Sequence, residues 1–320
     1  MKKTTLPLLL LFVAVVSTWG QSTFTVLPKF QIGDTLVYEA SSVNNESFKE
    51  ILPSAVNPSN RKFYLVVKGT DNDGNLKVDY LMKEVKTVEK TELLKEMPLI
   101  GEVEKFFKED MLKNPLRLTL DRAGRLQGID NKDELTELYF QRILPAILDI
   151  AMKGKKHRPT AKEIQEVKES LKDEIDIMDI FEEVPALFKY YGQPLMEGKS
   201  ETVDSVTTKY VVARMGDGTT WLKTNTDLMH GSEEVEEINP GEEFLEDSGA
   251  ATDDEEGDEG FDLGITATQI EDYKYSKEGI VTYLKLVVSL GSKDISEPNS
   301  AYTGGTEVKL IEIKKGSRKV

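Results

Sequence analysis

Tight-turn signals divide much of this chain into strand-length segments, and they limit its fold more than any other feature of the sequence. The tetrapeptide from Asp71 to Gly74 (DNDG) joins the segments 61–68 and 75–85, which both have the composition of strands. Asp-Gly tolerates the positive φ angles of a tight turn, so a β-hairpin is predicted here. The tetrapeptide 121–124 (DRAG) predicts a second hairpin, between 116–120 and 125–129.

Helical periodicity follows the second hairpin. Apolar residues recur at helical spacing over 135–150, directly after a helix-start signal at Asn131. The same reasoning predicts a second helix over 160–171 and a third helical stretch over 175–191. The helical section is therefore expected to span 131–191.

Strand patterns return after the helical section, in the segments 202–215, 219–226, 265–275, 279–290 and 307–314. Runs of strands, then helices, then strands favour an α+β fold. The expected architecture is a curved antiparallel β-sheet or half-barrel with a central helical insertion packed on one face. Residues 21–320 are predicted to form a single domain.

The first twenty residues have the pattern of a signal peptide. Lys2 and Lys3 precede an apolar run from Leu6 to Val16, and cleavage is expected near Gly20. The run is shorter than the roughly 20 residues that a membrane span needs, although an uncleaved anchor is the alternative. We therefore expect an exported protein, periplasmic or secreted, with no stable transmembrane anchor after cleavage.

The chain contains no cysteine. An exported fold without cysteine has no disulfides and no thiol for lipid attachment. A chain of 320 residues is long enough to bury a conventional apolar core instead. Its stability is therefore expected to come from packing.

Nearly all of the net charge of −16 arises from one segment, 232–262, which holds 15 Asp and Glu and neither Lys nor Arg. Such a composition buries too little apolar surface to offset the entropy of ordering, so a disordered acidic loop is predicted. Nucleic acid is excluded as a partner, because binding phosphates requires a basic stripe.

Motifs for catalysis, cofactors or metals are lacking in the sequence. The two histidines, His157 and His230, are far apart and have no neighbouring Cys or zinc-ligand spacing. Signatures of nucleophile elbows, P-loops and dinucleotide sites are absent from the sequence as well. We therefore expect a protein that is not an enzyme, with no catalytic residue, no cofactor and no metal.

Aromatic and apolar residues near the end of the helical section are the candidate ligand contacts. They are Phe181, Leu187, Phe188, Tyr190 and Tyr191. One interpretation is that they line a cavity between helices and sheet. The alternative is that they pack the core, as apolar residues at this spacing commonly do.

The order of elements resembles that of uncharacterised β-rich secreted or periplasmic proteins of Bacteroidota. The residues that carry the resemblance are Gly33, Asp34 and Tyr38 after the signal, Asp121 and Gly124 in the second hairpin, and the turn Ser276 to Gly279. At the level of the fold the order is also similar to periplasmic lipoprotein carriers, and this resemblance implies an apolar concavity that holds acyl chains.

Two functions follow as hypotheses. The first is an exported soluble binding protein of the cell envelope that holds an apolar or peptide ligand between sheet and helices, without catalysis. The alternative is a surface or envelope interaction protein whose acidic loop, 232–262, engages basic partners or divalent cations. The expected partner is accordingly an apolar ligand or an envelope protein.

Overall fold

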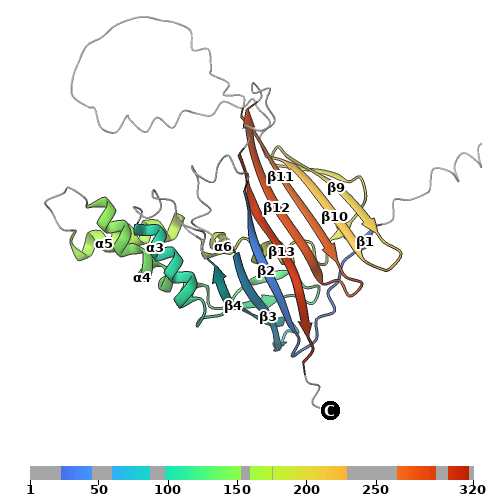
Figure 1. The fold of residues 1–320 in the computed structure, drawn as a ribbon, viewed down its shortest axis with the longest axis horizontal. Helices are drawn as coiled ribbons and strands as arrows, with labels where there is room; N and C mark the ends of the chain where they lie inside the picture. The colour runs from blue at the N-terminus through green and yellow to red at the C-terminus, as the bar shows by residue number, and fades with distance from the viewer. Residues whose placement is uncertain are drawn as a thin grey trace, which may run out of the picture.

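The computed structural model describes residues 23–44, 60–86, 98–152, 159–174, 176–228, 265–292 and 302–316. Figure 1 shows a large antiparallel sheet with a few helices, so the coarse prediction of a β-rich fold with helices is confirmed. The predicted signal peptide, the acidic loop and both histidines lie outside the described residues.

The large sheet has eleven antiparallel strands in the order β6-β5-β4-β3-β2-β13-β12-β11-β10-β9-β8. Their bounds are β2 Thr35–Asn44, β3 Asn60–Thr70, β4 Leu76–Lys86, β5 Leu116–Leu120, β6 Leu126–Ile129, β8 Ser200–Val203, β9 Val206–Arg214, β10 Thr220–Asp227, β11 Ile265–Tyr275, β12 Val281–Ser292 and β13 Tyr302–Lys314. The sheet is not closed, since β6 and β8 form its two edges. Both edge strands are short, with four residues each.

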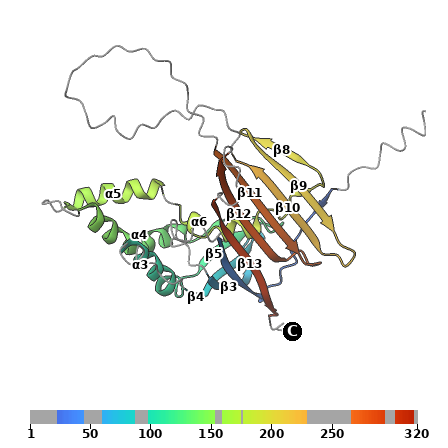
Figure 2. The ribbon, with the colours of Figure 1, turned by 45° about the horizontal axis from the view of Figure 1, so that its top comes forward.

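The helices are α3 Pro98–Lys105, the π-helix η2 Phe106–Asp110, α4 Lys132–Ala151, α5 Ala161–Glu174, α6 Ile177–Ile180 and α7 Glu183–Phe188. A separate two-stranded sheet pairs β1 Phe24–Thr25 with β7 Pro194–Leu195. Figures 1 and 2 show α3, α4 and α5 to one side of the large sheet. Neither α3 nor η2 is predicted from the sequence, although the buried residues Val103, Phe106 and Phe107 follow helical spacing.

Both predicted hairpins are confirmed, as β3–β4 and β5–β6. In the first turn, the Asp71 carboxylate accepts backbone hydrogen bonds from Asn75 at 2.8 Å and Asp73 at 3.0 Å. These bonds, the one from Asn75 above all, hold the pKa of Asp71 below its usual range. Gly74 has φ +82°, which a glycine adopts without strain. The turn is therefore specified by its own residues.

The bounds of some strands differ from the prediction. The predicted strand 202–215 is two strands, β8 and β9, joined by Asp204 and Ser205 with φ 47° and 65°. Positive φ at two successive residues forms a tight hairpin turn, and Asp tolerates it without the usual Gly signal. The strand β2 begins at Thr35, directly after a turn at Gly33, whose φ is +90°.

The turn at Gly279 gives a prediction about stability. Gly279 has φ +74°, and a Cβ added to it would lie 2.3 Å from the carbonyl oxygen of Leu27. We expect Gly279→Ala to lower the free energy of unfolding by about 2–4 kcal/mol, from left-handed backbone strain and overpacking. Urea unfolding measures this.

Gly216 provides the matched control. No heavy atom lies within 4 Å of the position where its Cβ would be, and its φ is not positive. Gly216→Ala should therefore change the unfolding midpoint little. Equal unfolding midpoints for the two variants would show that Leu27 does not pack on the Gly279 turn in solution.

Candidate functional site

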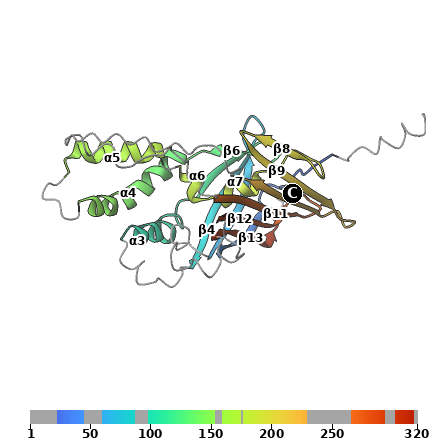
Figure 3. The ribbon, with the colours of Figure 1, turned by 90° about the horizontal axis from the view of Figure 1, so that it is seen from above.

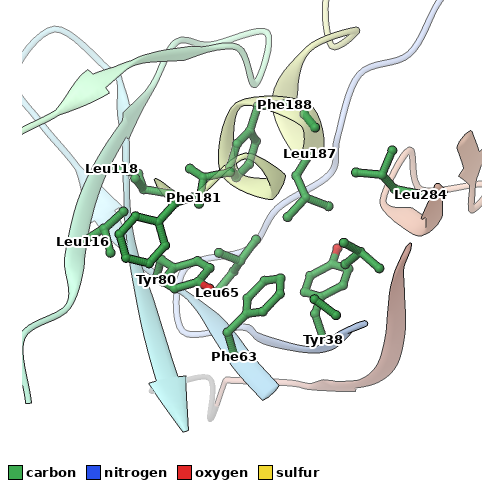
Figure 4. Close-up of a cluster of buried hydrophobic side chains, with 14 of the residues drawn as sticks. Tyr38, Phe63, Leu65, Tyr80, Leu116, Leu118, Phe181, Leu187, Phe188 and Leu284 are labelled. Atoms are coloured by element: carbon green, nitrogen blue, oxygen red, sulfur yellow. The ribbon is translucent and has the colours of Figure 1, made fainter. Parts of the chain in front are cut away.

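The helices α6 and α7 pack on one face of the large sheet, which we name the inner face. Seen from above, α7 lies between β4 and β11 (Figure 3). Figure 4 shows Phe181 and Leu187 directed from this helical segment towards side chains of the strands. The ring of Phe181 meets Tyr80 edge-on at 5.8 Å and Phe107 at 5.5 Å between centroids. The inner face beside α7 is thus a packed apolar core.

All five candidate ligand contacts lie together in this core. They are at most 3 % exposed: Phe181, Leu187, Phe188, Tyr190 and Tyr191. The ring of Tyr190 meets Tyr273 at 5.1 Å, and that of Tyr191 meets Tyr275 at 5.9 Å. These contacts are those expected from the core-packing interpretation, and they leave almost none of the five side chains accessible from solvent.

A buried ion pair fastens α7 to one half of the sheet. Glu183 in α7 and Arg61 in β3 are 1 % and 4 % exposed. Arg61 donates from Nε to Oε1 of Glu183 at 3.0 Å and from a second nitrogen to Oε2. The Tyr80 hydroxyl also donates to Oε1 of Glu183, at 2.7 Å. Burial alone would lower the pKa of Arg61, but the Glu183 carboxylate, together with Tyr80 and Glu182, raises that pKa overall. Arg61 is therefore held as a cation.

A second polar cluster fastens the end of α7 to the other half of the sheet, around Glu271 in β11. One carboxylate oxygen of Glu271 accepts from Lys189 Nζ at 2.6 Å and from Gln269 Nε2 at 2.7 Å. The other accepts from the Tyr190 hydroxyl at 2.6 Å and the Thr224 hydroxyl at 3.4 Å. Burial, and next the charge of Glu271, raise the pKa of Tyr190, so this hydroxyl stays a donor.

Strand register arranges the inner face in successive rows of paired residues. A core row is at most 3 % exposed and consists of Val212, Leu222, Tyr273, Leu284 and Val308. The next row towards the far ends of β10 and β12 is mostly polar: Tyr210, Thr224, Glu271, Leu286 and Thr306. In this row Glu271 contacts Lys189 and Tyr190, and the Thr306 hydroxyl donates to Glu182 beside α7. The helical segment is thus anchored at the polar row.

From the polar row onwards, the residues of β12 on the inner face are apolar and become more accessible. We name Leu228, Leu286, Val288 and Leu290 the exposed inner strip. Leu228 is 36 % exposed, Leu290 is 41 % exposed, and Leu286 and Val288 are half-buried. Leu290 pairs with Ala267, whose carbonyl accepts from the Leu228 backbone at 2.8 Å, so the strip spans neighbouring strands.

The opposite, outer face of the same strands carries charged and aromatic pairs beside some apolar residues. The Trp221 indole donates to Asp272, and the Lys274 ammonium lies 5.1 Å from the centre of the Tyr283 ring. Burial, with a hydrogen bond to Glu307, raises the pKa of Tyr283 to about 12. The inner face at the far end of β12 therefore presents accessible apolar side chains, whereas the outer face carries these charged and aromatic pairs.

No protein-family model matches this chain, and no curated protein matches it. Among the described residues, no helix is long and apolar enough to cross a membrane. The described part also has no group of three or more His, Cys, Asp or Glu side chains that could hold a metal ion. The class of the protein is therefore defined by its fold, a large open antiparallel sheet with a few helices.

Sequence reasoning missed both polar clusters and the exposed inner strip. Arg61 and Glu183 are 122 residues apart, and Tyr190 and Glu271 are 81 apart. A charged residue at an inner strand position has the same sequence pattern as one at an outer position until the partner is known. The only local signal was the recurrence of Tyr, Glu and Gln at alternate positions in β11.

Proposed function

We propose that this protein is an exported binding protein of the cell envelope that holds an apolar or peptide ligand and performs no catalysis. In this proposal the sheet acts as a half-barrel, α4 to α7 form its helical insertion, and the ligand lies on the inner face. One observation carries the proposal: along β12, Leu284 is 1 % exposed beside α7, whereas Leu290 on the same face is 41 % exposed.

Accessibility decides which residues contact the ligand. A ligand gains free energy by covering apolar surface that was in contact with water, at about 25 cal/mol per Å². Phe181 and its four companions have no such surface to offer, because they already cover one another and the sheet. The exposed inner strip has it, so we assign the ligand to the strip and assign Tyr190 and its neighbours to the packed core at one end of the strip.

Contiguity distinguishes the strip from scattered surface residues. Single exposed apolar residues are common and need no explanation. Leu286, Val288 and Leu290 occupy successive positions on one face of one strand, about 7 Å apart, and Leu228 lies near the same end of the sheet. Their polar neighbours Thr226 and Gln269 supply hydrogen-bonding groups beside the apolar row.

Two substitutions at neighbouring residues of β12, one on each face, test the assignment. Val288 faces inwards and Val287 faces outwards, and both are half-buried. We expect Val288→Lys to weaken binding of the neutral fluorescent probe N-phenylnaphthylamine by about tenfold or more, since a desolvated ammonium costs over 1.4 kcal/mol. Fluorescence titration measures the affinity.

Val287→Lys is the control, and it should leave the affinity close to that of the unchanged protein. Equal effects of both substitutions, or no binding of the probe by the unchanged protein, would contradict the proposal. Native mass spectrometry of protein purified from its host supplies an independent measurement, with a bound mass of small-molecule or peptide size as the expected result.

The alternative function concerns residues that the structure does not describe. Engagement of basic partners or divalent cations by the acidic segment 232–262 therefore stays a prediction from the sequence. Export likewise rests on residues 1–20, and fractionation of the host cell for the processed chain tests it.

A further inference from the structure

Lys189 is the accessible charge of the polar cluster around Glu271. It follows α7 directly, and its ammonium lies 2.6 Å from the Glu271 carboxylate. The Lys189 side chain is 44 % exposed, whereas that of Glu271 is 2 % exposed. A ligand on the inner face near this cluster therefore meets a cation before it can reach the anion.

The hydrogen-bonding capacity of the two side chains also favours contact of the ligand with Lys189 over Glu271. Four donors already satisfy the two oxygens of Glu271. The Lys189 ammonium has three donors, and among the described residues it donates one, to Glu271; the ammonium also lies 5.2 Å from the centre of the Tyr190 ring. Lys189 thus retains donors for an acidic group, while Glu271 has no accessible oxygen for a basic one.

The cation and the exposed inner strip are adjacent. Glu271 pairs directly with Leu286 and Gln269 with Val288, and directly paired residues on one face have Cβ atoms about 5 Å apart. From the Glu271–Leu286 pair to the Ala267–Leu290 pair is four residues, or about 14 Å along the strands. The Lys189 ammonium therefore lies at the start of an apolar path along β12.

We propose that the ligand is a single-chain amphiphile with a carboxylate head, such as a long-chain fatty acid, and that Lys189 binds the head. The alkyl chain lies over Leu286, Val288 and Leu290. This inference rests on the proposed binding function and specifies its ligand. Lys189 acts in binding alone, through an ion pair and a charge-assisted hydrogen bond.

Glu182 is the opposing charge to consider. Its carboxylate accepts from the hydroxyl of Thr306 in β13, which lies two strands from Glu271 in β11, or about 10 Å. At that distance it does not share the head group with Lys189, and a partly exposed pair so far apart interacts weakly in salt. An amine head placed at Glu182 is the competing outcome, which the test includes.

Displacement of N-phenylnaphthylamine by three ligands of equal chain length tests the inference: dodecanoate, dodecanol and dodecylammonium. At neutral pH we expect dodecanoate to bind about two to five times more tightly than dodecanol, as one partly exposed ion pair supplies. Lys189→Met should abolish this preference, and Lys189→Arg should keep it. Lys209→Met is the matched control, because Lys209 is exposed on the outer face of β9, and it should retain the preference.

The outcomes separate the inference from the proposed function. Equal displacement by acid and alcohol, or tighter binding of the amine, overturns the role of Lys189 while the binding function stands. Failure of the unchanged protein to bind the neutral probe defeats the binding function itself. Thermal unfolding verifies that each variant is folded. If Lys189→Met does not fold, the preference for dodecanoate over dodecanol and dodecylammonium in the unchanged protein and in Lys189→Arg still tests the role of Lys189.

Discussion

Replacing Arg61 by Ala is expected to lower the free energy of unfolding by about 3–5 kcal/mol, because the change leaves the Glu183 carboxylate buried without its cation. Tyr80 still donates to that carboxylate, but one neutral hydroxyl does not replace a charged two-nitrogen partner. The measurement is urea unfolding followed by circular dichroism.

Lys62 is the matched control, one residue further along β3. Its ammonium is 3.8 Å from Glu39, and both side chains are partly exposed, so Lys62→Ala should cost less than about 1 kcal/mol. The double variant Arg61→Met with Glu183→Leu should recover much of the loss, because it removes both charges. A cost for Arg61→Ala equal to that of Lys62→Ala would mean that α7 is not fastened to β3 in solution.

This ion pair matters for function because α7 packs on the same face of the sheet as the proposed ligand. Glu183 fastens α7 to β3, and Lys189 and Tyr190 fasten its end to Glu271 in β11. A single short helix therefore connects the two halves of an open sheet. Loosening it at Arg61 should disturb the position of Lys189 as well.

The strands were predictable from the sequence where their turns are specified locally. Asp71 and Gly74 contain within four residues the chemistry that closes the β3–β4 hairpin. The turn at Asp204 and Ser205 was missed because positive φ occurs there without a glycine. Where turn chemistry is explicit in the residue types, sequence reasoning succeeds.

The candidate site was predictable only in part, for a physical reason. Phe181, Phe188 and Tyr191 follow helical spacing, so their clustering could be expected, but their burial depends on strands more than 80 residues away in sequence. In β12, Val287 and Val288 are equally apolar, and only the position of α7 makes one face inner. Alternation cannot identify the buried side when both sides carry apolar residues.

The second large expected effect is at Phe181, and it separates core packing from ligand contact. Phe181 is 0 % exposed and packs against Tyr80 and Phe107, so Phe181→Ala should cost about 3–5 kcal/mol through lost burial and the cavity left behind. Leu112→Ala, at a residue that is 42 % exposed, should cost less than about 1 kcal/mol.

Probe binding completes the test, because stability and affinity should respond to different residues. Folded Phe181→Ala should bind N-phenylnaphthylamine within about twofold of the unchanged protein, a difference below 0.5 kcal/mol. Val288→Lys should show the reverse, with a large loss of affinity and a small loss of stability, since Val288 is only half-buried. A variant at Phe181 that keeps its stability but loses the probe would place the ligand among the five aromatic and apolar residues of the helical segment instead of on β12.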